Sequence, residues 1–226
     1  MKLLDLFCGA GGSAVGYHRA GFDEIVGVDI KFQKRYPFQF VQADALEFCA
    51  SFGAGFDAIH ASPPCQGYSV GTNFNHLKYG KFVYPQLIAE TRRQLRRTSR
   101  MYVIENVVGA KRAMGFRMRL CGTQFGLRVQ RHRLFESSQL LMSPHEPCNH
   151  RPFDISLRKR RCEFLLTYRD VVTKNGFRVR RPSFCPAGIA AQAMGVEWMN
   201  SAEAGESIPP AYTEFIGRQL LEDLRA

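Results

Sequence analysis

Short apolar runs alternate with amphipathic stretches along the first half of the chain. Each run has the length of a buried strand, and most of the stretches between the runs have helical spacing. The predicted strands cover residues 2–7, 24–29, 39–42, 56–61 and 101–105. The predicted helices cover residues 12–20, 43–51 and 85–98. Elements in this order predict an α/β fold with a doubly wound, mostly parallel sheet.

The pattern changes after about residue 140. Residues 143–187 are rich in Pro, Arg and Cys, and Asn175-Gly176 predicts a tight hairpin turn within 171–179. Helical patterns return at 188–198 and 211–224. We therefore predict a main domain, a small basic recognition subdomain, and C-terminal helices that return to the main domain, at residues 1–142, 143–187 and 188–226.

The charge of the chain is high and uneven. The formal net charge is +11 and the pI is about 9.6, which favours a polyanionic partner. Residues 151–185 hold ten basic and three acidic side chains, so this one segment carries most of the excess. A solvated basic face is the alternative, but a segment this concentrated favours a nucleic-acid surface.

Several protein classes are disfavoured by what the sequence lacks. No apolar run reaches the roughly 18 residues of a membrane span. The chain opens directly with an apolar strand rather than with a signal peptide, so we expect a cytoplasmic protein, in a bacterial or phage-infected cell. Seven irregularly spaced cysteines suggest free thiols rather than a disulfide framework.

Four chemically suggestive segments lie at the carboxyl ends of predicted strands. They are residues 7–12, Asp29, Pro63–Gln66 and Glu105. In a doubly wound sheet, ligands bind beyond the carboxyl ends of the strands. The four segments are therefore expected to meet at one edge of the sheet.

The first segment matches a loose nucleotide-binding fingerprint. Gly9-Ala10-Gly11-Gly12-Ser13-Ala14 follows G-x-G-x-x-[GA], a pattern compatible with NAD, FAD or S-adenosylmethionine. Asp29 follows the glycine-rich loop at about the sequence spacing that the fingerprint requires of the residue that accepts bonds from ribose hydroxyls. Asp44 could cap the helix that follows it, or it could accept a bond from an adenine amino group.

The other segments suggest covalent catalysis. Cys65 follows Pro63-Pro64 in a polar loop, which indicates a nucleophile rather than a structural thiol. Glu105 ends an apolar strand, and its burial would raise its pKa and let it donate a proton. Arg131 and Arg133 alternate before an apolar pair and are predicted to share one face of a strand, suited to an anionic or carbonyl ligand. His60 is interpreted as a core histidine.

A zinc site was considered and set aside. His145, Cys148, His150, Cys162 and Cys185 offer suitable atoms, but their spacing is irregular and no second Cys-x-x-Cys pair completes a set. The sequence therefore predicts no metal.

At this point the chain resembles the DNA (cytosine-5) methyltransferases. The motifs follow family order and span nearly the whole chain: Asp5-Leu6-Phe7-Cys8-Gly9-Ala10-Gly11-Gly12 for the cofactor loop, Pro63-Pro64-Cys65-Gln66 for the nucleophile, Glu105-Asn106-Val107 for the acid, Arg131-His132-Arg133, and Gly205-Glu206-Ser207-Ile208-Pro209-Pro210. The resemblance implies a Rossmann-like class I methyltransferase fold and S-adenosyl-L-methionine as the cofactor.

The resemblance also assigns roles to residues. It implies catalytic roles for Cys65, Glu105, Arg131 and Arg133. It implies cofactor contacts from Asp5, Phe7, Gly9, Gly11, Gly12, Asp29, Ile30, Asp44, Ala45 and Pro63. The expected DNA contacts are Gln66, Ser69, Arg178, Arg180 and Arg181. The implied substrate is DNA, as a duplex with a flipped cytosine, and residues 67–83 would form a loop that closes over the base.

The chain departs from the family pattern in three places. Val129 replaces the leading Gln of the Gln-x-Arg-x-Arg motif, which weakens the expected bracing of the loop. Gly205-Glu206 stands where the family has Gly-Asn. The recognition segment has only about 45 residues, so a partner protein could supply part of the recognition surface.

Three alternatives stay open. A nicotinamide- or flavin-dependent oxidoreductase could use the same glycine-rich loop, although its chemistry needs neither the Cys65 motif nor the Glu105 motif. A non-catalytic DNA-binding relative could keep the fold. An enzyme of the same chemistry could act on RNA or single-stranded DNA.

Overall fold

The computed structural model describes residues 1–68, 84–150, 168–172, 178–182 and 187–226. Its centre is a seven-stranded sheet in the order β3-β2-β1-β4-β5-β7-β6. The strands are β1 (Lys2–Leu6), β2 (Glu24–Asp29), β3 (Gln39–Gln42), β4 (Ala58–Ala61), β5 (Met101–Asn106), β6 (Arg117–Leu120) and β7 (Arg133–Ser137). The first five are parallel, and β7 pairs antiparallel with both β5 and β6. The predicted doubly wound, mostly parallel sheet is confirmed.

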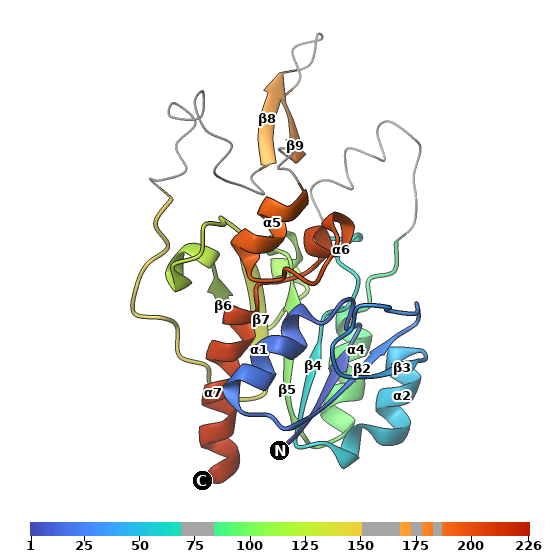
Figure 1. Cartoon of the computed structure of the whole chain (residues 1–226). Coiled ribbons are helices and arrows are strands. Elements are labelled where there is room, and N and C mark those ends of the chain that lie inside the picture. Colours follow the sequence, from blue (N-terminus) through green and yellow to red (C-terminus); the bar gives the residue numbers. More distant parts are fainter. Residues whose placement is uncertain (69–83, 151–167, 173–177, 183–186) are drawn as a thin grey trace.

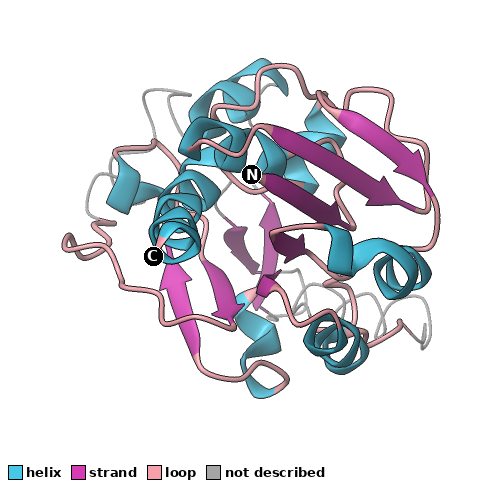
Figure 2. Ribbon diagram, turned by 90° about the horizontal axis from the view of Figure 1, so that it is seen from below, coloured by secondary structure: helices cyan, strands magenta, loops and turns pink. Residues whose placement is uncertain are grey.

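Helices cover both faces of the sheet (Figure 2). The longer ones are α1 (Gly12–Ala20), α2 (Ala45–Phe52), α4 (Ile88–Arg97), α5 (Ala187–Met194), α6 (Ser201–Glu206) and α7 (Pro210–Arg225). Short 3-10 turns form η1 (Gly53–Gly55), η2 (Val108–Arg112) and η3 (Gly122–Phe125). Among the described residues, no helix is long and apolar enough to cross a membrane.

Alternation along the strands divides the core into two layers. Leu3 of β1 points into a layer shared with α1 and α7, whereas Leu4 and Leu6 point into a layer shared with α2 and α4. All three leucines have no exposed surface. This two-sided burial is what continuous apolar strands in a parallel sheet require.

The C-terminal helix α7 packs closely against α1, the helix after the glycine loop. A Cβ atom on Gly16 of α1 would lie 2.0 Å from Thr213 Oγ1 and 2.1 Å from the carbonyl oxygen of Pro210. The hydroxyl of Thr213 also donates to the carbonyl of Ser13 at 2.8 Å. A glycine at position 16 therefore lets the two ends of the chain meet beside the loop.

Several boundaries differ from the sequence predictions. The helix predicted at 188–198 ends at Met194, because Gly195 adopts a left-handed φ of 71°, and the separate helix α6 follows. Strand β6 was not predicted. Its Arg-Met-Arg-Leu sequence alternates exposed and buried side chains over only four residues.

The predicted hairpin is present and is longer than expected. Strands β8 (Tyr168–Val172) and β9 (Arg178–Pro182) pair antiparallel, with Val171 opposite Val179. The turn at Asn175-Gly176 lies outside the described residues. In Figure 1 this hairpin lies above α5, on the side toward which the parallel strands run.

Candidate active site at the carboxyl edge of the sheet

The site begins at the switch point of the sheet. From β1 the chain winds outward through β2 and β3, then returns to β4 on the other side of β1 and continues to β5. Loops that leave β1 and β4 therefore diverge, which opens a crevice beyond their carboxyl ends. The glycine loop follows β1, and the Pro63–Gln66 segment follows β4.

The glycine loop has the tight backbone that its sequence predicts. Phe7, Gly9 and Gly11 have left-handed φ angles of 56°, 49° and 83°. The backbone N–H of Gly9 donates to Asp29 Oδ2 at 3.1 Å, and the N–H of Lys31 donates to Asp29 Oδ1 at 2.9 Å. Asp29 thus ties the loop to the end of β2, and its partly exposed carboxylate lies where a ribose would be held.

Asp5 requires a correction. Its side chain has no exposed surface, so it offers no oxygen to a ligand. Ser13 Oγ donates to its carboxylate at 3.0 Å, and Tyr36 Oη lies 3.3 Å away. Burial raises the pKa of Asp5 to about 8, although both hydroxyls act to lower it. Asp5 supports the glycine loop from behind rather than contacting the cofactor.

Asp44 acts as the N-cap of α2. Its Oδ1 accepts bonds from the N–H groups of Leu46 at 2.8 Å and Glu47 at 3.0 Å. Both cap bonds end on the same oxygen, so capping and a bond from Oδ2 to an adenine amino group are compatible. The side chain of Ala45 is only 3% exposed and packs into the core, whereas Ile30 is 66% exposed beside Asp29.

The Pro63–Gln66 segment after β4 is braced by the last residue of β5. Asn106 Nδ2 donates to the carbonyl oxygen of the buried Pro63 at 2.9 Å, and both groups are buried. The N–H of Tyr68 donates to the carbonyl of Cys65 at 2.9 Å. Cys65 is partly exposed and the next residue, Gln66, is exposed. The sequence pattern predicted no role for Asn106, although its position beside Glu105 was a usable signal.

Glu105 and Arg133 form a buried ion pair, with Arg133 Nε 2.9 Å from Glu105 Oε1. Burial raises the pKa of Glu105 and outweighs the attraction of Arg133, as the sequence predicted. Burial also raises the pKa of the Cys65 thiol, against the lowering effect of Arg133. The net shift is upward because desolvation of the thiolate is a larger effect than the attraction of Arg133.

Arg131 does not share a strand with Arg133, because β7 begins at Arg133. Arg131 Nη2 instead donates to the carbonyl of Gly205 at 2.7 Å, and its own carbonyl accepts a bond from the hydroxyl of Tyr212. The prediction that Arg131 and Arg133 share one face of a strand is therefore wrong. Arg131 joins the segment before β7 to the C-terminal motif.

The C-terminal motif closes onto the glycine loop. A Cβ atom on Gly12 would lie 2.0 Å from Ser207 Oγ and 2.6 Å from the carbonyl oxygen of Ile208. Trp198 Nε1 donates to the carbonyl of Ala10 at 2.9 Å, a contact that no local sequence signal indicated.

The Val129 position keeps a bracing role by apolar packing. Val129 is 1% exposed and shares a small cluster with Ala10 and with residues from 191 to 204. Nearby, the ring of Phe125 on η3 packs against Tyr212 and Phe215 of α7, with ring centroids 5.4 and 5.7 Å apart.

The predicted DNA contacts lie mostly outside the described side chains. Ser69 and nearly all of the 67–83 loop fall in an undescribed stretch. For Arg178, Arg180 and Arg181 only the backbone is described, as part of β9. These assignments stay predictions.

His60 is a core histidine, as interpreted from the sequence. It has no exposed surface, and its ring contacts Tyr17 Oη at 3.1 Å and Ser62 Oγ at 3.0 Å. Burial lowers the pKa of His60 to about 3, so the ring is neutral.

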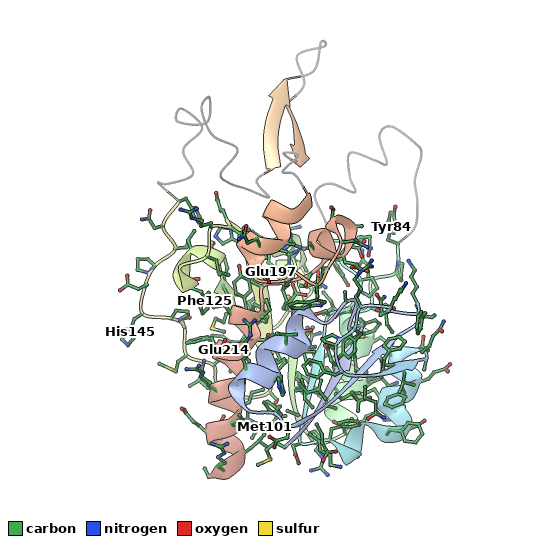
Figure 3. All side chains as sticks on the ribbon, viewed as in Figure 1. Tyr84, Met101, Phe125, His145, Glu197 and Glu214 are labelled. Carbon is green, nitrogen blue, oxygen red and sulfur yellow. The ribbon has the colours of Figure 1, made fainter. Side chains whose placement is uncertain are left out.

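The prediction of no metal rested on an incomplete set of residues. Cys148 and His150 lie beside Cys121 and His132, and the last two were not among the predicted candidate ligands. The four ligand atoms of these residues all lie within 4.8 Å of one another. His145, which it had considered, is exposed and points away from the body of the protein (Figure 3).

Comparison with solved structures agrees with this fold. The chain matches the crystal structure of the Dnmt2 methyltransferase of S. pombe with a TM-score of 0.60 and 15% identity, over 100% of this chain and 99% of that one. It also matches a crystal structure described as a DNA modification methyltransferase encoded within an E. coli prophage, with a TM-score of 0.59, 16% identity and full coverage of both chains.

Comparison with curated sequences adds two shorter matches. The chain is 36% identical over 75 residues to the type II methyltransferase M.FnuDI of Fusobacterium nucleatum, which is 30% of this chain and 22% of that protein. It is 31% identical over 84 residues to the type II methyltransferase M.AgeI of Thalassovita gelatinovora, over 30% of this chain and 20% of that protein. The matches span about a fifth of each relative's length.

The family-level match covers the part of the chain that holds the nucleotide loop, the nucleophile loop and the acid. The model of the C-5 cytosine-specific DNA methylases matches residues 1–114, half of the 226 residues. Asp29, Cys65 and Glu105 lie within this match, whereas Arg131 and Arg133 lie beyond it. The chain therefore belongs to the C-5 cytosine-specific DNA methylase family.

Proposed function

We propose that this protein transfers a methyl group from S-adenosylmethionine to C5 of cytosine in DNA. The observation that carries the proposal is that Cys65, in the loop after β4, and Glu105, the second-last residue of the adjacent strand β5, lie at the same carboxyl edge of the sheet. Arg133 pairs with Glu105 at 2.9 Å and also acts electrostatically on Cys65. A nucleophile, a carboxyl group of raised pKa and a cation therefore meet at one point.

The residues around the crevice fit S-adenosylmethionine. The left-handed backbone of Phe7, Gly9 and Gly11 lets the loop approach a ligand closely. The carboxylate of Asp29 would accept bonds from the ribose, the exposed Ile30 would cover one face of the adenine, and Asp44 would accept from its amino group. When bound, this cofactor supplies an electrophilic methyl group on its sulfonium.

The chain's own residues make C5 reactive. Cytosine C5 is a weak nucleophile, and addition of the Cys65 thiolate to C6 converts the ring to an enamine. Glu105 would hold N3 and the amino group and stabilise the charge that develops there, and Arg131 and Arg133 would hold O2. The sulfur–methyl bond of the cofactor would break as the C5–methyl bond forms, and the neutral thioether S-adenosylhomocysteine would be the leaving group. Loss of the C5 proton to water and cleavage of the C6–sulfur bond would then restore the aromatic ring and the thiolate.

DNA is the proposed substrate, as a duplex with the target cytosine flipped out of the stack. Residues 1–142 would form the catalytic domain, 143–187 the basic recognition segment, and 188–226 the helices that close the cofactor pocket. Gln66, exposed beside Cys65, would contact the DNA around the flipped base. The bacterial and prophage sources of the relatives support a bacterial or phage-infected cell as the setting.

The chemistry is tested with Cys65→Ser. Methyl transfer to DNA should fall more than about 100-fold, which corresponds to about 2.7 kcal/mol in the barrier, while S-adenosylmethionine affinity stays near that of the wild type. DNA that contains 5-fluorocytosine should trap a covalent adduct with the wild type only. Cys49→Ala, on the buried face of α2, is the control and should keep activity. A serine variant with more than about a hundredth of wild-type turnover would contradict the assignment.

Recognition is tested by replacing Arg178, Arg180 and Arg181 of β9 with Ala. Each lost phosphate contact reduces the dependence of DNA affinity on salt, so both affinity and salt slope should fall. The control removes equal charge at the other end of the strands, with Arg96, Arg97 and Arg100 changed to Ala. Arg96 and Arg97 end α4, Arg100 precedes β5, and all three are exposed. Equal losses in the two triple variants would show a general charge effect and contradict a specific DNA surface on β9. A partner protein would be indicated if methylation mapping shows a long, strictly read site only when cell extract is added.

A further inference from the structure

Two cysteines and two histidines from distant parts of the sequence gather beside β6 and β7. Cys121 directly follows β6, and His132 directly precedes β7. Cys148 and His150 lie in the segment after β7 that ends the described part of this region. The four potential ligand atoms, two Sγ atoms and two ring nitrogens, all lie within 4.8 Å of one another.

The distances within this Cys-His cluster match those of a tetrahedral metal site. Cys121 Sγ lies 3.5 Å from His150 Nε2, and Cys148 Sγ lies 3.7 Å from His132 Nε2. Zinc binds thiolate sulfur at about 2.3 Å and imidazole nitrogen at about 2.0–2.1 Å, so tetrahedral ligands of these two kinds lie about 3.6 Å apart. We propose that Cys121, His132, Cys148 and His150 bind a structural zinc ion.

Neighbouring polar groups support the ligands as a metal site requires. The side-chain amide of Gln130 lies 3.2 Å from Nδ1 of His150, the ring nitrogen that faces away from the cluster. With its oxygen turned to the ring, this amide accepts the Nδ1–H and presents Nε2 to the metal. Thr123 Oγ1 donates to Cys121 Sγ at 3.4 Å, which stabilises a thiolate.

The ligand set favours zinc among the common metals. Two thiolates and two imidazoles in a tetrahedron suit Zn²⁺, whereas Mg²⁺ and Ca²⁺ require oxygen ligands. The two thiolates balance the charge of the ion, which makes the site compatible with the burial of Cys121 at 1% exposure. Four protein ligands also leave no position open for a substrate, so the site is structural rather than catalytic.

A zinc ion here would join three segments, those that carry Cys121, His132, and Cys148 with His150. His132 lies between Arg131 and Arg133, so the metal would fix the short segment that carries both arginines. Cys148 and His150 lie just before residues 151–185, which carry most of the excess positive charge, so the same ion would fasten the start of the recognition segment to the sheet edge. This inference does not depend on the proposed methyl transfer.

The first experiment measures metal in the full-length protein, purified without chelators, by elemental mass spectrometry. We expect about one zinc per chain. Replacement of zinc by Co²⁺ should give the visible bands of a tetrahedral ion and a thiolate-to-cobalt charge-transfer band in the near ultraviolet. A wild-type protein that lacks zinc and gives no such spectrum on addition of Co²⁺ would overturn the proposal, whatever the behaviour of the variants.

Variants then assign the ligands. His150→Ala and Cys148→Ser should each lower the zinc content at least fivefold, and Cys148→Ser should weaken the charge-transfer band. His145→Ala is the matched control, because His145 is exposed and lies outside the cluster, and it should keep the full content. Equal zinc in His145→Ala and His150→Ala would contradict the assignment. So would an intact mass two hydrogens below that of the reduced chain, with the loss mapped to Cys121 and Cys148, because it shows a disulfide in place of the metal.

Discussion

Arg133, the first residue of β7, reaches across to Glu105 near the end of the adjacent antiparallel strand β5, and the Nε and Oε1 atoms lie 2.9 Å apart. The guanidinium is 14% exposed and the carboxyl 9%. Both groups act electrostatically on Cys65: Arg133 lowers the pKa of its thiol and Glu105 raises it. The reactivity of the nucleophile therefore depends on the balance of this pair against burial.

The pH dependence of Cys65 alkylation tests that balance. The thiolate is the reactive form, and a raised pKa means that the rate of reaction with iodoacetamide increases with pH through a midpoint above the ordinary thiol value. Arg133→Ala should move this midpoint to higher pH, and Glu105→Gln should move it lower. Arg133→Lys retains the charge and is the control. The rate at Cys65 is followed by peptide mapping, and identical midpoints in all four proteins would contradict the electrostatic account.

The bond from Asn106 to Pro63 should position the nucleophile loop. Asn106→Asp keeps the volume and the acceptor that Val107 N–H uses, but it replaces the donor with an oxygen facing the Pro63 carbonyl. A buried carbonyl without its donor costs about 1–3 kcal/mol. We expect lower unfolding free energy and a larger fall in kcat than in cofactor affinity. Chemical denaturation and single-turnover methylation measure the two effects; unchanged turnover would show that the bond does not position Cys65.

Contact between the glycine loop and the C-terminal motif can be probed with two glycines. Gly12→Ala places a Cβ atom 2.0 Å from Ser207 Oγ and 2.6 Å from a backbone oxygen, so it should weaken S-adenosylmethionine binding at least tenfold. Gly205→Ala has no atom within 4 Å of the added Cβ and should bind normally, with a small gain in helix propensity. Calorimetric titration compares them. Normal binding by Gly12→Ala would mean that Ser207 and Ile208 do not close the pocket.

Asp5 should make the protein less stable as pH rises. Its pKa is about 8 in the folded protein and near the ordinary 3.8 in the unfolded chain. The folded state therefore holds the proton more tightly, and unfolding free energy falls as pH increases from about 4 to about 8. Asp5→Asn, which cannot ionise, should lose this component. The difference in unfolding free energy between variant and wild type should shift in favour of the variant from pH 4 to pH 8, by a few kcal/mol. A constant difference would show that Asp5 is ionised throughout.

Local sequence patterns predicted several elements at their observed bounds. The helix at 12–20 and the strands at 24–29 and 39–42 match α1, β2 and β3. Each is specified by its own residues, through apolar periodicity and flanking turn residues. Cys65 and Glu105 were also placed correctly at strand ends, because parallel strands must end at a common edge.

Local sequence patterns did not predict the contacts between segments that are distant in the sequence. Strand β6 is too short to be recognised by itself and exists through pairing with β7. Cys121 and His132 join Cys148 and His150 because two strands bring the segments together, not because of any regular spacing. The motif around Asp5 predicted a cofactor contact. In the structure the hydroxyls of Ser13 and Tyr36 bond to its carboxylate, so Asp5 is buried and supports the glycine loop.

The pKa values at the site also depend partly on residue types, which the sequence shows, and partly on burial, which only the folded structure decides. Residue types alone identified Cys65, Glu105 and Arg133 as the groups of interest. Whether an arginine or desolvation controls a thiol depends on how much water the surrounding atoms exclude, which is a property of the packed chain. Here burial exceeds the attraction of Arg133, so the pKa of Cys65 is raised even though a cation lies close by.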